Sequence, residues 1–202
     1  MKEHAPAPQG PPVGDEKVLL RTNRGDLVVG LYDGVAPKHA AQIRKLVRLG
    51  VYDTTSIFRV EPGFVAQVVN AQNRKTALTR EQHAAITPIA AEFSKLQHRA
   101  GVVSMARDDD DVNSAETSFS FMLGRAPELD GKFTIIGEVE FGRPLLAMIA
   151  REPRDKQNRP FNPIVIEHGE VKTAAQIAQM QAAHELRAAM PLPKPPPPPR
   201  RL

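Results

Sequence analysis

A series of short apolar runs, each followed by turn residues, limits what this chain can fold into. The runs are rich in Val, Ile and Phe, as strands are, and Gly, Pro, Asn or Asp stand between them. Two internal segments, 36–50 and 143–152, instead place apolar residues at helical spacing. Many strands with few helices favour an antiparallel barrel or sandwich over alternating strand–helix–strand units. The predicted strands are 18–22, 27–32, 56–60, 64–69, 100–106, 118–123, 133–139 and 163–171.

Length and charge exclude several classes of protein. A chain of 202 residues suits one packed domain with tails, and no apolar run approaches the ~18 residues of a membrane span. The chain has no cysteine, which excludes disulfides, thiolate chemistry and cysteine-type zinc sites. Of the net charge of +4, the last twelve residues contribute Lys194, Arg200 and Arg201. The remainder has no dense basic stripe, so we expect no nucleic-acid partner.

The N-terminal residues differ in composition from the middle of the chain. Residues 1–17 are rich in Pro and Gly and are predicted to be a flexible leader before a domain over 18–170. The leader lacks the apolar core of a signal peptide. The compartment stays open: cytoplasmic, or exported if a signal segment has been removed.

The C-terminal residues are predicted to form a helix followed by a tail. Thr173 is a candidate N-cap for an Ala- and Gln-rich helix within 171–190, whose apolar stripe of Ile177, Met180 and Leu186 is thin. Consecutive prolines make the basic tail, 191–202, extended. We interpret it as a disordered tail in preference to a ligand for a proline-binding adaptor domain.

The stretch 52–67, YDTTSIFRVEPGFVAQ, holds Arg59 among apolar residues, where a guanidinium is costly to bury without a partner or a function. It is similar to the cyclophilin signature, in which a Tyr-Asp-Gly turn leads to Phe-His-Arg-Val, Pro-Gly-Phe and Gln. The segment 101–139 resembles that family's Gly-x-x-Ser-Met-Ala, Ser-Gln-Phe-Phe and Leu-Asp-Gly-Lys motifs in the same order. The resemblance runs from about Val18 to Glu170. It implies a mainly β fold: a closed eight-stranded antiparallel β-barrel capped by two α-helices, here with an extra C-terminal helix.

The resemblance also implies an activity, peptidyl-prolyl cis-trans isomerisation. Its substrates would be the X-Pro bonds of proline-containing polypeptides, its role would be to assist protein folding, and it would need no cofactor or metal. An arginine suits this chemistry because its charged, planar fork can be oriented by one acceptor while another N–H meets the proline nitrogen. The positions that match the family's site are Arg59 and Gln67 as the catalytic pair, and Phe64, Val65, Ala106 and Leu129 in the substrate groove.

Several positions expected to bind substrate depart from the family's pattern. The pocket should be wider and wetter because Ser120 replaces an aromatic wall, while Phe133 partly refills it from the other side. Glu128 predicts weak or absent cyclosporin binding. The departures keep a second interpretation open, a weakly active or inactive peptide-binding scaffold; a third makes the Pro-rich tail the functional end. The replacements are His by Phe58, Asn by Arg107, Gln by Ser118, Phe by Ser120, Trp or Phe by Glu128, and His by Phe133.

Other polar residues predict no second chemistry. The acidic run 108–111 lacks EF-hand spacing, so we interpret it as a solvated loop that favours substrates with basic residues beside the proline. The six histidines are dispersed without ligand spacing. Ser114, Ser118 and Ser120 lie in no Gly-x-Ser-x-Gly elbow and the sequence suggests no His–Asp pairing, so we expect no hydrolase. We expect a monomer.

Overall fold

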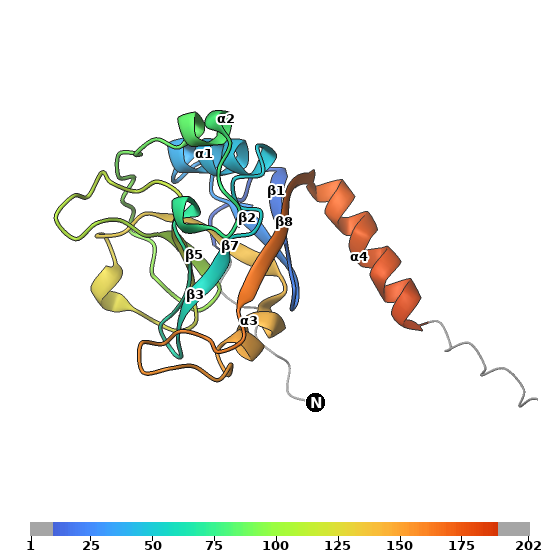
Figure 1. Cartoon of the computed structure of the whole chain (residues 1–202). Helices are drawn as coiled ribbons and strands as arrows, with labels where there is room; N and C mark the ends of the chain where they lie inside the picture. The colour runs from blue at the N-terminus through green and yellow to red at the C-terminus, as the bar shows by residue number, and fades with distance from the viewer. Residues whose placement is uncertain (1–9, 190–202) are drawn as a thin grey trace, which may run out of the picture.

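The chain forms a closed barrel of eight antiparallel strands (Figure 1). The structure is a computed structural model, and it describes residues 10–189. Around the barrel the strand order is β1-β2-β7-β5-β6-β4-β3-β8, so every strand is paired on both sides. The fold class predicted from the sequence is confirmed. The strands are β1 (Glu16–Thr22), β2 (Gly25–Leu31), β3 (Ser56–Glu61), β4 (Val65–Val68), β5 (Val102–Met105), β6 (Phe119–Met122), β7 (Ile135–Phe141) and β8 (Ile164–Thr173).

Alternation of side chains along the strands fills the barrel. In β1, Val18 and Leu20 belong to the main core, whereas Leu19 between them packs on the outside against the C-terminal helix. In β6, Phe119 and Phe121 are buried in the same core, and their rings meet edge to face with centroids 5.4 Å apart. The intervening residues of β6 therefore face outward, which matters for the site below.

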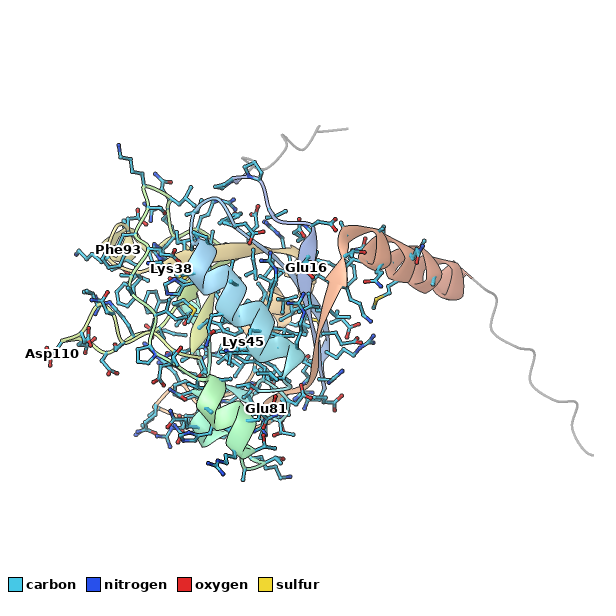
Figure 2. All side chains as sticks on the ribbon, turned by 90° about the horizontal axis from the view of Figure 1, so that it is seen from above. Glu16, Lys38, Lys45, Glu81, Phe93 and Asp110 are labelled. Carbon is cyan, nitrogen blue, oxygen red and sulfur yellow. The ribbon has the colours of Figure 1, made fainter. Side chains whose placement is uncertain are left out.

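Three helices lie at the ends of the barrel. The two segments with helical spacing form α1 (Pro37–Arg48) and α3 (Arg143–Ile149), each with a proline in its first turn, where the missing amide proton costs nothing. In the long connection between β4 and β5, a 3-10 turn (Ala71–Asn73) is followed by α2 (Arg80–Ala85). Helices α1 and α2 lie together at one end of the barrel, and α3 lies at the other (Figures 1 and 2).

The long connection also caps α1. Ala36, at the N-cap position, offers no side-chain acceptor. The Glu92 carboxylate takes its place and accepts the amides of Lys38 (3.1 Å) and His39 (3.0 Å). The His39 ring, which is fully buried, also contacts Glu92, with Nδ1 2.6 Å from Oε2. A residue more than fifty positions away in the sequence thus satisfies the first turn of the helix.

The first and last strands, β1 and β8, extend past the limits of 18–170 predicted for the domain. Strand β1 begins at Glu16, and β8 runs on to Thr173. Before β1, the Gly14 amide donates to the Leu31 carbonyl at 2.9 Å, so the end of the predicted leader lies against the barrel. The rest of that leader, residues 1–9, and the predicted tail lie outside the described residues.

Helix α4 (Ala174–Ala189) follows β8 directly and projects from the barrel (Figure 1). Thr173 is its N-cap: its hydroxyl accepts the Gln176 amide at 3.2 Å, and Gln176 accepts the Thr173 amide in return. Ile177 and Met180 pack on the barrel, whereas the side chain of Leu186 lies outside the described part. No helix within residues 10–189 is long and apolar enough to cross a membrane.

Candidate active site

A cavity of about 260 Å³ opens on the outer face of β4, β5 and β6 and brings most of the predicted site residues together. Ser104, Met105 and Met122, which were not predicted as site residues, also line it, as does Asp109 of the acidic run. A larger groove of about 840 Å³, between α3, α4 and the β1–β2 hairpin, contains none of the predicted residues. The predicted residues that line the cavity are Arg59, Phe64, Val65, Gln67, Ala106, Arg107, Ser120, Leu129 and Phe133.

The Arg59 guanidinium lies at this cavity and is held by acceptors on its own hairpin. Its Nη2 donates to Glu61 Oε2 at 2.6 Å, and its Nη1 lies 3.5 Å from Gln67 Oε1. Its central carbon is 5.7 Å from the centre of the Phe64 ring. The side chain keeps 37% of its surface exposed, so one part of the fork is fixed while the rest is accessible. The sequence-based reasoning missed Glu61, although alternation along β3 puts positions 59 and 61 on one face.

A turn and a close backbone contact fix the position of Phe64. Gly63 has a φ of +76°, a conformation that glycine adopts without strain. The Phe64 carbonyl accepts the amide of Leu123 at 2.8 Å. A Cβ on Gly124 would lie 2.0 Å from the Gly63 carbonyl oxygen, so only glycine permits this approach. The ring at the cavity is therefore held by two glycines that do not line it.

Three predicted residues lie outside the cavity lining. Phe58 occupies an irregularity in the β3–β4 pairing between Ile57 and Arg59 and is 38% exposed. Ser118 donates to the Val68 carbonyl at 2.7 Å and reaches the site only through Gln67, whose Nε2 is 3.5 Å from its hydroxyl. Glu128 is exposed in the 3-10 turn that precedes the Leu129 side chain.

Arg107 and Phe133 form one rim of the cavity. The Arg107 guanidinium carbon lies 4.4 Å from the centre of the Phe133 ring, a cation–π contact. The same guanidinium donates to the carbonyls of Asp108 (2.7 Å) and Asp109 (3.1 Å). Arg107 therefore ties the start of the acidic loop to the ring that was expected to refill the pocket.

The acidic loop lies beside the cavity. Asp109 lines it, whereas Asp110 lies at the tip of the loop, on the side of the molecule away from α4 (Figure 2). Among residues 10–189, no group of His, Asp or Glu side chains has the arrangement of a metal site.

A buried hydrogen-bonded row runs behind the cavity. His98 Nδ1 is 3.0 Å from Asp130 Oδ1, and His98 Nε2 is 3.0 Å from the Ser104 hydroxyl. Arg125 pairs with Asp130 from the surface side and lowers the pKa of that carboxyl to about 2. Burial lowers the pKa of His98, so the ring is neutral at pH 7. Its Nδ1–H then donates to Asp130, and its Nε2 accepts from Ser104.

This row contains a His–Asp pair that the sequence did not suggest. The order Ser104, His98, Asp130 resembles a hydrolase triad, but the neighbouring Met105 amide already donates to the Thr134 carbonyl at 2.9 Å. That amide is therefore unavailable to stabilise an oxyanion. The row connects the Leu129–Asp130 turn to β5 and so holds two walls of the cavity in register.

Because His39 and His98 are buried, we expect the free energy of unfolding to fall in mild acid. Burial lowers the pKa of both His39 and His98 in the folded chain, against about 6.5 when unfolded. Below pH 6.5 the unfolded chain takes up protons that the folded chain does not. From pH 7.5 to 5.5 we therefore expect the free energy of unfolding in urea to fall, by at most about 1.4 kcal/mol for each histidine.

The charged groups that face the His39 and His98 rings determine the pH range of this effect. Glu92 and Lys38 face His39, and Asp130, Arg125 and Glu128 face His98. The pKa values of Glu92 and Asp130 are lowered, so both carboxylates stay ionised throughout. His39→Gln should remove about half of the pH dependence, whereas His83→Gln on exposed α2 should keep all of it. Equal stability at the two pH values would refute the prediction.

Comparison with known proteins agrees with this barrel. Residues 17–171 match the sequence model of the family described as cyclophilin type peptidyl-prolyl cis-trans isomerase/CLD. The peptidyl-prolyl cis-trans isomerase CYP23 of Arabidopsis thaliana is 42% identical over 152 residues, which cover 74% of this chain and 67% of that protein. A probable peptidyl-prolyl cis-trans isomerase of Brucella suis is 33% identical over 155 residues, covering 74% of this chain and 79% of the relative.

The fold is also that of a solved structure. A cyclophilin type isomerase of Cryptosporidium parvum, crystallised in the presence of the dipeptide Ala-Pro, superposes with a TM-score of 0.68. It is 24% identical, and the alignment covers 78% of this chain and 99% of that one. The sequence match over most of the barrel shows that this chain belongs to the family of cyclophilin-type peptidyl-prolyl cis-trans isomerases.

Proposed function

We propose that this chain catalyses rotation about X-Pro peptide bonds in proline-containing polypeptides and so assists their folding. The observation that carries the proposal is the Arg59 guanidinium, held by Glu61 and Gln67 at the opening of a partly apolar cavity.

The reaction needs a positioned donor more than a nucleophile. Rotation is slow because the peptide C–N bond has partial double-bond character, with a barrier of about 18–20 kcal/mol. The lone pair of the proline nitrogen becomes available only as the amide twists. A donor aimed at that nitrogen therefore binds the transition state more tightly than the ground state and raises the rate. In our proposal an N–H of Arg59 is this donor, and Gln67 with Glu61 orients it.

The remaining residues of the cavity bind the substrate in this proposal. Phe64 and Leu129 contact the proline ring, while Val65, Ala106 and Phe133 complete the apolar lining. Gln67 and Arg107 are near enough to the cavity to hold the flanking peptide backbone. The chemistry uses side chains alone, so the proposed mechanism includes no cofactor.

Two finer expectations belong to the same proposal. Glu128 is exposed and lies outside the cavity, so the aromatic contact expected for cyclosporin is missing and binding should be weak or absent. We also expect the protein to act as a monomer without a nucleic-acid partner.

A peptide-binding module with little catalysis is the competing function. Ser120 favours it, because the apolar wall that would hold the ring is replaced by a hydroxyl. Losing one buried aromatic wall removes about 1.5–3 kcal/mol of apolar burial.

Exchange NMR on a short peptide with one Ala-Pro bond separates the two functions. Free in solution, the two isomers interconvert over tens to hundreds of seconds. We expect the wild-type protein at micromolar concentration to bring exchange below one second. Binding of the peptide with exchange at the uncatalysed rate would support the module instead.

Substituting Glu61 tests how the guanidinium is oriented. Without the 2.6 Å acceptor, only Gln67 at 3.5 Å constrains the fork, so we expect Glu61→Ala to lower kcat/KM by about fivefold. The pair is about 40% exposed, and the free energy of unfolding should change by less than about 0.5 kcal/mol. A rise in kcat/KM would mean that Glu61 competes with the substrate for Arg59.

A further inference from the structure

A row of polar side chains crosses the floor of the cavity. Gln67 of β4 pairs with Ser120 of β6, which in turn pairs with Ser104 of β5. Directly opposed residues on antiparallel strands place their side chains on one face, about 5 Å apart. All three line the cavity, although a site for a proline ring needs an apolar floor.

The central hydroxyl of this row is the one without a partner. Ser104 is bonded to His98, and the Gln67 amide group contacts Arg59 and Ser118. Ser120 is only 9% exposed, and within residues 10–189 its hydroxyl has no protein partner. It is open to the cavity and to water, because the fully buried unpartnered side-chain atoms of the described residues are Tyr32 Oη and His39 Nε2. A hydroxyl that faces the cavity can exchange its hydrogen bond with water for one with a ligand group, a net gain of about 0.5–1.5 kcal/mol.

The geometry of proline determines which part of a substrate meets Ser120. The ring nitrogen and Cα belong to the peptide backbone and stay at the cavity opening, near Arg59. Cγ is the ring atom opposite them, so it enters deepest and approaches the outward face of β6. Unmodified proline presents only C–H groups there. A hydroxyl on Cγ presents a donor and an acceptor.

We propose that the cavity binds 4-hydroxyproline in preference to proline, and that Ser120 is the residue that sets this preference. The inference rests on the proposed function, since it concerns the same cavity and the same imino-acid ring. The substrate class is X–4-hydroxyproline bonds, with the ring hydroxyl exchanging a hydrogen bond with Ser120. The apolar wall of Phe64 and Leu129 still contacts the ring faces.

Paired peptides test the preference without relying on turnover. The probes are one peptide sequence with proline and the same sequence with each Cγ epimer of 4-hydroxyproline, and Kd is measured by calorimetry. For wild type we expect one epimer to bind about two- to tenfold more tightly than proline, the range of one net hydrogen bond. Ser120→Ala should reduce that ratio to one or less.

Ser56→Ala is the matched control, because Ser56 lies at the start of β3 and does not line the cavity. It should keep the wild-type ratio. Equal binding of all peptides to wild type, a preference that survives in Ser120→Ala, or no binding of any peptide would overturn the inference. Preference without faster exchange would refute only the proposed isomerase, and faster exchange without preference would refute only the role of Ser120.

Discussion

Replacing Arg59 with alanine is expected to lower kcat/KM for X-Pro isomerisation by about 100- to 1000-fold. Loss of one positioned donor to a developing charge has effects of this size in enzyme sites. Exchange NMR on the Ala-Pro peptide measures it. Arg59→Lys keeps the charge but not the planar fork, so it cannot hold Glu61 and Gln67 while donating to the substrate. We expect it to recover less than a tenth of the activity.

Arg24→Ala is the matched control for this prediction. Arg24 also pairs with a carboxylate, Glu152 at 3.0 Å, but lies in the β1–β2 turn and does not line the cavity. Its activity should stay within twofold of wild type. Because Arg59 is partly exposed, the urea midpoint of Arg59→Ala should also change little. Activity of Arg59→Ala within twofold of wild type would refute the catalytic role of Arg59.

Replacing Phe121 with alanine is expected to destabilise the barrel by about 3–5 kcal/mol, a large part of the 5–15 kcal/mol typical of a folded domain. Phe121 is fully buried and packs edge to face on Phe119. Because the barrel interior is filled, its neighbours have little room to collapse into the space left behind. Urea unfolding followed by circular dichroism measures the loss as a shift of the midpoint.

Phe161→Ala is the matched control for Phe121→Ala, because it removes the same side chain from an exposed position. Phe161 is 67% exposed in the loop before β8, so its removal should cost less than about 0.5 kcal/mol. A loss below about 1 kcal/mol at Phe121 would show that the barrel interior rearranges around the gap.

The barrel could be predicted from the sequence because its strands carry local signals. Apolar runs between turn residues gave the strands, and Pro37 with the helical spacing after it gave α1. That the sheet closes into a barrel was predicted only from the resemblance of segments 52–67 and 101–139 to the cyclophilin motifs. No single apolar run indicates closure. Strand ends were less well predicted: backbone pairing with β1 carries β8 past the predicted end at Val171, through the polar residues Lys172 and Thr173.

Contacts between distant segments could not be predicted. Nothing near Glu92 in the sequence identifies it as the cap of α1, and His98 stands 32 residues before Asp130. Phe58 was expected beside Arg59 in the site, but the irregular pairing of β3 leaves it exposed at the surface. Such features depend on how the folded chain brings surfaces together, whereas sequence patterns report mainly on neighbours along one element.

Closure of the barrel has a consequence for the proposed action on incompletely folded polypeptides. An extended polypeptide can pair with the unpaired backbone amides and carbonyls of an exposed edge strand. Such edge strands promote aggregation. In the described part of this chain each strand already has two partners, so a client polypeptide finds no edge strand to extend. In the proposed function a client is therefore held by side chains at the cavity and not by pairing with the edge of the sheet.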